Sequence, residues 1–319
     1  MPLISSSYRA PVLFSNPHLQ TVCPSLFRRV RGVDYERIRI DTPDGDFLDL
    51  DFSRSGSNRV AILLHGLEGN STRAYVLGMV RALNRNGWDA LAMNFRGCSG
   101  ECNRKLRFYH SGDTQDLRTV LSHVSDKEPY AELVLIGFSI GGNIVLKYLG
   151  ECGNNVPPIV RKAVTFSVPC DLASSSYKLA ELGNRLYLKR FLRMLHQKIQ
   201  MKMEIMPDRI DDTGFRKIKT FQDFDDRYTA PIHGFKDALD YWNKASCKPY
   251  LPHIAIPTLL VNSADDPFLT EPCYPIPEAE ANPFLFLEIP GAGGHVGFVQ
   301  FNRRGEYWSE SRTISFIER

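Results

Sequence analysis

Short apolar runs alternate with helical patterns along the first half of the chain. Four segments are almost continuously apolar, as expected for strands that are buried on both faces of a sheet: 59–66, 88–95, 133–137 and 163–168. Between these runs, helical patterns occur at 73–86, 113–124 and 140–150. This alternation predicts an α/β fold with a mostly parallel sheet and helices on both of its faces.

The pattern differs at the start of the chain and in its third quarter. Residues 36–52 read as two strands around a Pro-Asp-Gly-Asp turn, which predicts an N-terminal antiparallel hairpin. Residues 171–250 contain no strand-like run, whereas 256–263 and 284–290 restore the strand pattern. We therefore expect a single domain over residues 1–319, with a helical cap inserted at about 171–250 over the strand ends.

Composition and charge exclude several classes of protein. The 319 residues are 43% hydrophobic and 24% charged, which is typical of a folded globular chain. A net charge of +3 is too small to predict a nucleic-acid partner. No signal-peptide core and no apolar run of roughly 18 residues is visible, so we expect a cytoplasmic protein without a membrane span.

The seven cysteines are scattered and odd in number, which argues against a disulfide framework and favours a reducing compartment. Cys98 and Cys102 form the closest pair, but no second pair with zinc-ligand spacing follows them. We expect no metal site.

The segment Gly137-Phe138-Ser139-Ile140-Gly141 fits the G-x-S-x-G pattern of a nucleophile elbow. The predicted strand LVLI precedes it and the predicted helix NIVLKYL follows it, which is the arrangement that exposes the serine hydroxyl above a sheet. The pattern therefore predicts Ser139 as a nucleophile.

A serine nucleophile needs a base and an acid, which in such folds follow it in the order acid, then histidine. His295 lies in a glycine-rich loop after the last predicted strand, where the base is expected. Asp265 and Asp266 both follow the strand 256–263; we favour Asp266, because Pro267 fixes the turn that aims it, and expect Asp265 to cap the turn. The other histidines after the serine lie in the cap or before a strand: His196, His233 and His253.

An oxyanion hole requires two backbone N–H groups. Ile140, directly after the nucleophile, is expected to supply one of them, and Leu67, in the loop after LLHG, is expected to supply the other. We expect His65 to brace this loop through hydrogen bonds.

The cap contains an amphipathic pattern. Its apolar positions are Leu188, Phe191, Leu192, Leu195 and Ile199, and its cations, mostly elsewhere on the helix, are Arg185, Lys189, Arg190, Arg193 and Lys198. Three interpretations remain open: an apolar wall for an acyl chain, a basic helix that lies on membranes, and ordinary packing with solvated charges. Peripheral lipid contact through the cap belongs to the second interpretation.

With these residues placed, the chain resembles the YheT-like branch of the α/β-hydrolases, a family of predicted esterases related to mammalian abhydrolase-domain lipases. The resemblance runs from the N-terminal region almost to the end. It is carried by NPHLQT (16–21), HGLEGNS (65–71), NFRGCSG (94–100), YHSGDT (109–114), GFSIGGN (137–143), FDDRYTAPIHGF (224–235), ADDPF (264–268) and GGHVGF (293–298). The family's charge-relay residues fall on Ser139, Asp266 and His295.

This resemblance implies hydrolysis of small carboxylic esters with short to medium acyl chains, without a cofactor. The alternatives are an acyltransferase or amidase that uses the same three residues, and a non-catalytic protein that binds a lipid or a partner. Four further residues lie in or near the shared motifs, and we expect them to brace the cap: His18, Arg96, His110 and Arg227.

Overall fold

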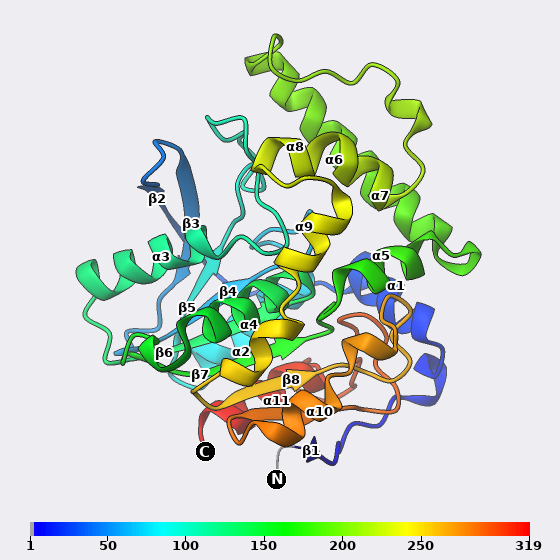
Figure 1. Cartoon of the computed structure of the whole chain (residues 1–319). Helices are drawn as coiled ribbons and strands as arrows, with labels where there is room; N and C mark the ends of the chain where they lie inside the picture. Colours follow the sequence, from blue (N-terminus) through cyan, green and yellow to red (C-terminus); the bar gives the residue numbers. More distant parts are fainter. Residues whose placement is uncertain (1–2) are drawn as a thin grey trace.

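A nine-stranded sheet runs through the centre of the computed structural model, which describes residues 3–319 (Figure 1). Its strands, in chain order, are β1 (Leu3–Ile4), β2 (Glu36–Asp41), β3 (Phe47–Ser53), β4 (Arg59–Leu64), β5 (Asp89–Met93), β6 (Glu132–Phe138), β7 (Val160–Phe166), β8 (Thr258–Val261) and β9 (Leu285–Glu288). In space they follow the order β1-β9-β8-β7-β6-β4-β5-β3-β2.

The strands from β1 to β5 in this spatial order are parallel, whereas β3 is antiparallel to both of its neighbours, β2 and β5. The predicted α/β fold with a mostly parallel sheet and an N-terminal antiparallel hairpin is therefore confirmed. The pairing of β1 with β9 was not predicted, because a two-residue strand is too short to show any period.

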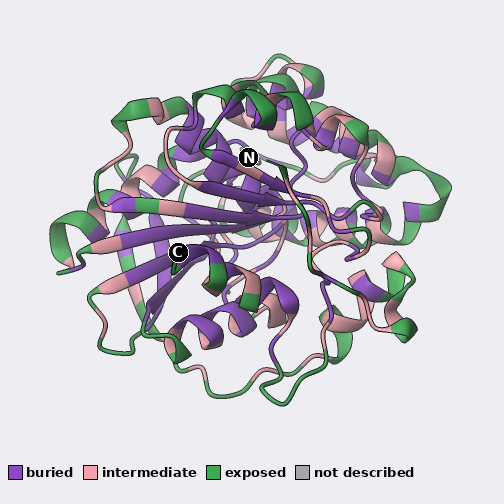
Figure 2. Cartoon of the chain, turned by 90° about the horizontal axis from the view of Figure 1, so that it is seen from below, coloured by how far each residue is buried: buried purple, intermediate pink, exposed green. Residues whose placement is uncertain are grey.

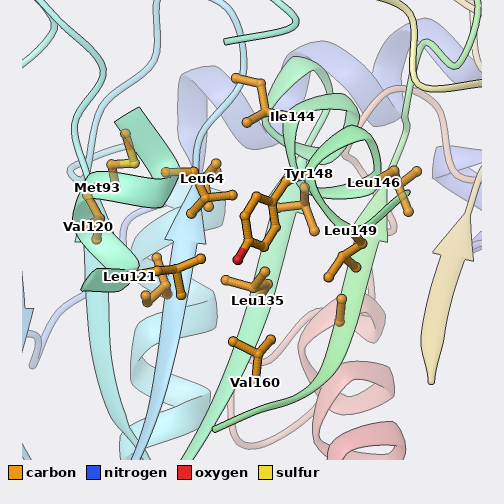
Figure 3. Packing of buried hydrophobic residues seen from close by; sticks show 14 of the residues in the cluster. Leu64, Met93, Val120, Leu121, Leu135, Ile144, Leu146, Tyr148, Leu149 and Val160 are labelled. Atoms are coloured by element: carbon orange, nitrogen blue, oxygen red, sulfur yellow. The ribbon is translucent and has the colours of Figure 1, made fainter. Parts of the chain in front are cut away.

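Helices cover both faces of the sheet. They are α2 (Ala74–Arg85) and α11 (Trp308–Ile317) on one face, and α3 (Thr114–Lys127), α4 (Ile140–Cys152) and α10 (Ile276–Ala281) on the other. Because neighbouring residues of a strand point to opposite faces, Ile62 of β4 packs in the cluster with α3 and α4, and Leu63 packs in the cluster with α2 and α11. Figure 3 shows the first cluster, in which Leu135 of β6 lies near Leu121 and Leu149. Figure 2 shows the strands buried between these layers.

Residues 171–250, which we call the cap, lie between β7 and β8 in the upper part of Figure 1 and contain helices but no strand. The cap helices are α5 (Leu172–Ala180), α6 (Arg185–Ile205), α7 (Phe221–Phe224), α8 (Ala230–His233) and α9 (Ala238–Ala245). They share an apolar cluster of their own, which includes Leu192 and Trp242 and which Phe268 of the body joins. The rest of the chain is called the body below.

The remaining helical segments are short, apart from α1 (Pro17–Phe27) beside the cap. The 3-10 turns are Val12–Phe14, Gly153–Asn155, Leu182–Asn184, Phe215–Lys217, Lys248–His253 and Glu271–Cys273, and a π-helical turn spans Asp225–Thr229. Within residues 3–319, no helix combines the length and the apolar content that are needed to cross a membrane.

Candidate active site

Ser139 lies at the sharp turn between β6 and α4. Its backbone adopts φ 54° and ψ −123°, a conformation that L-residues rarely adopt and that holds the side chain above the end of the sheet. The turn leaves no room for side chains at its flanking glycines: a Cβ on Gly141 would lie 2.4 Å from the Leu64 carbonyl oxygen, and a Cβ on Gly137 would lie 2.5 Å from the Cα of Gly142. The glycines of the motif are thus required by close backbone packing.

The structure brings Ser139 together with His295 and Asp266. The Ser139 Oγ lies 3.0 Å from His295 Nε2, and His295 Nδ1 lies 2.9 Å from Asp266 Oδ2. Asp266 is buried, and its Oδ1 also accepts a hydrogen bond from the Phe268 N–H at 2.9 Å. Because a carboxylate only accepts, this geometry places the imidazole proton on Nδ1 and leaves Nε2 free to accept the serine proton.

Asp265 makes a different contact from Asp266. Its Oδ1 accepts a hydrogen bond from the Gly294 N–H at 2.9 Å, so it holds the backbone of the histidine loop and does not touch the imidazole. Burial raises the pKa of this carboxyl group. We expected Asp265 to cap its own turn, but its side chain joins that turn to the histidine loop, 29 residues further along the chain.

Helix α1 supports the histidine loop from its other side, a contact that the sequence pattern did not reveal. The His295 N–H donates to Thr21 Oγ1 at 2.9 Å, and the buried Gln20 accepts from the Val299 N–H at 2.9 Å. Gly294 has φ 56° and lies so close to α1 that a Cβ would be 2.5 Å from the Pro17 carbonyl oxygen. The N-terminal motif NPHLQT thus positions the loop that carries His295.

His65 braces the loop that follows β4. Burial lowers the pKa of its imidazole to about 3, so the ring is neutral at physiological pH. Its Nδ1 donates to the Gly66 carbonyl oxygen at 2.7 Å, and its Nε2 accepts from the Phe95 N–H at 3.1 Å. Both ring nitrogens are engaged in holding backbone.

The loop after β4 leaves one N–H group free next to the serine. The N–H groups of Gly66 and Glu68 donate to the hydroxyl oxygens of Tyr75 and Tyr109, each at 2.9 Å. Within residues 3–319, the Leu67 N–H finds no acceptor, and the Ile140 N–H begins α4, where no helical partner exists. The loop passes close to the serine, since a Cβ on Gly66 would lie 3.2 Å from Ser139 Cβ.

A buried ion pair joins this loop to the cap. Glu68, which has φ 51°, accepts a hydrogen bond from the Tyr109 hydroxyl at 2.7 Å and lies 2.8 Å from Lys198 Nζ of α6. The Lys198 and Glu68 side chains are only 6% and 8% exposed. Burial alone would lower the pKa of Lys198, but the neighbouring Cys98 and Glu68 raise it above its ordinary value, so the lysine stays charged.

The grouping of Lys198 with the outward cations of the cap helix was wrong. Lys198 is buried beside Leu195 and Ile199, and Lys202, one turn further along α6, is buried as well and donates to the Asn103 carbonyl oxygen at 2.6 Å. Positions 195, 198, 199 and 202 follow one face of a helix. This helical spacing indicates that Lys198 and Lys202 lie on the buried face of α6, but their charge suggested exposed positions.

A cavity of about 290 Å³ extends from Ser139 and His295 between the body and the cap. Apolar side chains of the cap form a large part of its wall, among them Leu172, Leu179, Phe191, Met194 and Phe224. This placement favours the interpretation of the cap helix as an apolar wall.

Several polar groups of the cavity wall lie where the π-helical turn approaches the body, among them Asp225, His110 and His233. Burial raises the pKa of Asp225 to about 7, and this carboxyl accepts hydrogen bonds from Thr229 and from Trp242 Nε1 at 2.5 and 2.8 Å. Burial lowers the pKa values of His110, to about 3, and of His233. The two histidines are therefore uncharged at neutral pH.

Of the four residues expected to brace the cap, three make side-chain contacts with it or within it. His18 Nδ1 lies 3.0 Å from the Tyr187 hydroxyl, His110 packs edge-on against His233, and Arg227 binds Asp211 inside the cap. Arg96 meets the cap through its carbonyl oxygen, 3.5 Å from Lys198 Nζ, and its side chain points elsewhere. Its buried guanidinium binds three carboxylates of the body, Asp44, Asp46 and Asp116.

Comparisons with known proteins agree with this architecture. The profile of the family described as alpha/beta hydrolase fold matches residues 60–301. The chain is 38% identical over 312 residues to Escherichia coli YheT, which carries the name of an esterase, and the match covers 95% of this chain and 91% of that protein. It is 30% identical to the Homo sapiens phospholipase ABHD3, over 94% of this chain and 75% of that protein. A solved esterase from Pyrococcus furiosus shares the fold, with a TM-score of 0.61 at 18% identity, over 91% of this chain and 96% of that one.

Proposed function

The chain belongs to the YheT-like branch of the α/β-hydrolases, and from that premise we propose that it is a serine esterase in which Ser139, His295 and Asp266 form the catalytic triad. The observation that carries the proposal is the continuous hydrogen-bonded line from Ser139 Oγ through both nitrogens of His295 to the buried Asp266. Hydroxyl, imidazole and carboxylate in this order are what activation of a weak nucleophile requires.

The reaction proceeds by two acyl transfers. Ser139 Oγ attacks the ester carbonyl carbon while His295 Nε2 takes the hydroxyl proton, and Asp266 stabilises the resulting imidazolium. The oxyanion is held by the N–H groups of Leu67 and Ile140. His295 then gives its proton to the leaving alcohol, and a water molecule, activated by the same imidazole, attacks the acyl-enzyme and releases the free acid.

The substrate is a small carboxylic ester with a short to medium acyl chain. In support, the cavity beside Ser139 has a volume of about 290 Å³, near the lower end of the range for small-molecule sites, and its cap wall is apolar. The proposed mechanism uses side chains, backbone N–H groups and water, and calls for no cofactor. We treat the chain as a single hydrolase domain with the cap inserted at about 171–250, working in the cytoplasm, where its seven free cysteines stay reduced.

The test is hydrolysis of p-nitrophenyl esters from acetate to palmitate by the native chain and by Ser139→Ala. We expect activity that peaks at one acyl length and a loss of kcat of about 10⁴- to 10⁶-fold in the variant. Ser311→Ala, the same substitution at an exposed position of α11, serves as the matched control and should keep native turnover. Native turnover in Ser139→Ala would overturn the proposal. Folded native protein without hydrolysis, but with acyl transfer to an added alcohol or amine, would favour an acyltransferase or amidase.

A further inference from the structure

The most exposed large apolar side chains of the described residues are gathered around one end of the cap. Six of them are at least 69% exposed: Val12, Leu13, Phe27, Leu182, Leu186 and Phe301. Leu182 and Leu186 are 81% and 83% exposed, although each is a leucine in or beside a well-formed helix. Apolar side chains this exposed are unusual when they cluster, and clusters of this kind mark surfaces that contact a partner or a membrane.

These six side chains, which we call the rim patch, come from segments that contact one another. Phe14, at the end of the Val12–Phe14 turn, packs against Phe301 with ring centroids 5.7 Å apart. His18 of α1 lies 3.0 Å from the hydroxyl of Tyr187, the residue after Leu186. In Figure 1, α1 accordingly lies beside the connection from α5 to α6.

The rim patch lies beside the mouth of the cavity that leads to Ser139. Pro24 and Ser25 of α1 line the cavity on one side, and Tyr187 and Arg190 of α6 line it on the other. Ser25 and Arg190 are also exposed to solvent, so the cavity opens between these two helices. Leu186, one turn before Arg190, therefore stands at the opening.

The same end of α6 carries cations without counter-charges. Its exposed cations are Arg185, Lys189, Arg190 and Arg193. Within residues 3–319, none of the four lies within ion-pair distance of a carboxylate. The segment from Arg185 to Met203 contains no acidic residue, so the charge of this surface is not balanced along the helix.

We propose that the rim patch docks on an anionic lipid surface, with the mouth of the cavity facing the lipid. Exposed leucines and phenylalanines next to uncompensated arginines and lysines are the composition with which peripheral proteins bind the boundary between headgroups and acyl chains. The negative charge of such a lipid surface complements the cations of α6, and the apolar side chains of the rim patch become buried in it. The proposal deepens the proposed function, on which it rests, because it makes a lipid surface the source of the esters that enter between α1 and α6.

The experiment measures binding to vesicles with Ser139→Ala protein, so that the lipid is not hydrolysed. The probes are vesicles of phosphatidylcholine alone and of phosphatidylcholine mixed with phosphatidylglycerol, separated from free protein by sedimentation. We expect binding to the anionic vesicles and at least about tenfold weaker binding after Leu182→Asp/Leu186→Asp. Removal of two positive charges by Arg185→Gln/Lys189→Gln is expected to weaken binding to the anionic vesicles by at least about fivefold.

Matched variants control for charge and for exposure. Ile205→Asp/Leu239→Asp adds the same charge at exposed apolar positions outside the rim patch, Ile205 lying at the opposite end of α6. Lys127→Gln/Arg161→Gln removes the same charge at the end of the sheet opposite Ser139, where α3 ends and β7 begins. Both controls are expected to bind vesicles like the parent protein.

Hydrolysis of soluble p-nitrophenyl butyrate, measured in the same substitutions with Ser139 intact, separates this proposal from the proposed function. We expect turnover within about twofold of native for the rim variants, because the substituted side chains lie outside the cavity wall. Absence of vesicle binding, or equal binding by rim and control variants, would overturn the docking proposal while leaving the esterase proposal intact. Formation of a stable dimer through the rim patch, lost in Leu182→Asp/Leu186→Asp, would overturn it in favour of a protein partner.

Discussion

The body and the cap meet at Ser139, yet they hold their functional residues by different means. In the body, backbone conformation sets each position: Ser139 ends a buried strand in a left-handed turn, and Asp266 and His295 stand on loops that follow β8 and β9. The cap is joined to this frame largely through side chains, of which the buried Lys198 and Lys202 are the clearest. Backbone geometry is specified locally, whereas such side-chain contacts depend on two distant segments meeting correctly.

This difference has a consequence for the chemistry. The Leu67 N–H belongs to the body, but the next residue, Glu68, is held by Lys198 from the cap. The cap therefore acts both as the wall of the cavity and as a support of the oxyanion loop. Displacement of the cap would disturb the proposed oxyanion hole even where the triad stayed in place.

The sharpest test on the body side compares two adjacent carboxylates. Asp266→Asn removes the acceptor that fixes the His295 tautomer, and we expect kcat to fall by about 10⁴-fold. Asp265→Asn keeps an acceptor oxygen for the Gly294 N–H, and we expect a loss of less than about tenfold. The measurement is kcat with a soluble ester, with folding checked by circular dichroism. The reverse ranking would move the role of triad acid to Asp265.

The body could be predicted from the sequence because its signals are local. Strand β4 is apolar on both faces, so consecutive apolar residues such as Ile62 and Leu63 predict a buried strand. The glycines around Ser139 predict the tight turn that follows β6. The support of the histidine loop by Thr21 could not be predicted in this way, since it joins residues 274 positions apart.

The contacts of the cap were not visible in the sequence for a related reason. A lysine on a cationic helix is ordinarily solvated, and only a partner such as Glu68 makes its burial favourable. The burial of Asp225 could not be predicted from the sequence either, because it results from the packing of the π-helical turn against Trp242. Periodicity places side chains on a face of a helix, but it does not say which charges find partners there.

The link between the two regions is tested at Lys198. Lys198→Met leaves the oxyanion loop without its ion pair to the cap, and we expect kcat to fall by about 10- to 100-fold with little change in KM. The reason is that a misplaced Leu67 N–H weakens the transition state more than the ground state, and that complete loss of such a donor costs about 10²- to 10³-fold.

The control for this variant lies on the same helix. Lys202→Met removes a buried lysine that binds Asn103 and Lys105, outside the oxyanion loop, so kcat should stay within about threefold of native in the protein that folds.

Two further variants test the charge of Lys198 itself. Lys198→Arg should retain most of the activity, because it keeps a cation beside Glu68. The double variant Glu68→Gln/Lys198→Met removes both charges and distinguishes a lost ion pair from an unpaired buried carboxylate. Equal losses of kcat in Lys198→Met and Lys202→Met would show that the cap acts only through its overall stability.

The smallest expected effect concerns the stability of the cap and its dependence on pH. The pKa of Asp225 is raised by burial to about 7, so the folded protein keeps this proton between roughly pH 4 and pH 7 while the unfolded chain has lost it. The unfolded state then binds fewer protons, and the contribution of Asp225 to stability falls as pH rises through this window. Above about pH 7 the full cost of the buried charge remains.

Asp225→Asn imitates the protonated carboxyl at every pH. The amide can still accept from Trp242 Nε1, and the Thr229 hydroxyl can turn to accept from the amide nitrogen. We therefore expect Tm of the variant to match native near pH 4 and to exceed it by about 2–5 °C at pH 8. The difference between the two melting curves isolates Asp225, because the opposite titrations of His65 and His110 occur in both proteins. Asp226→Asn, a change at the exposed neighbouring carboxyl whose charge adds a minor part to the raised pKa of Asp225, should show a much smaller growth with pH. A difference for Asp225→Asn that stays constant from pH 4 to pH 8 would mean that this carboxyl is ionised in the folded cap throughout, and that its contacts there stabilise the charge.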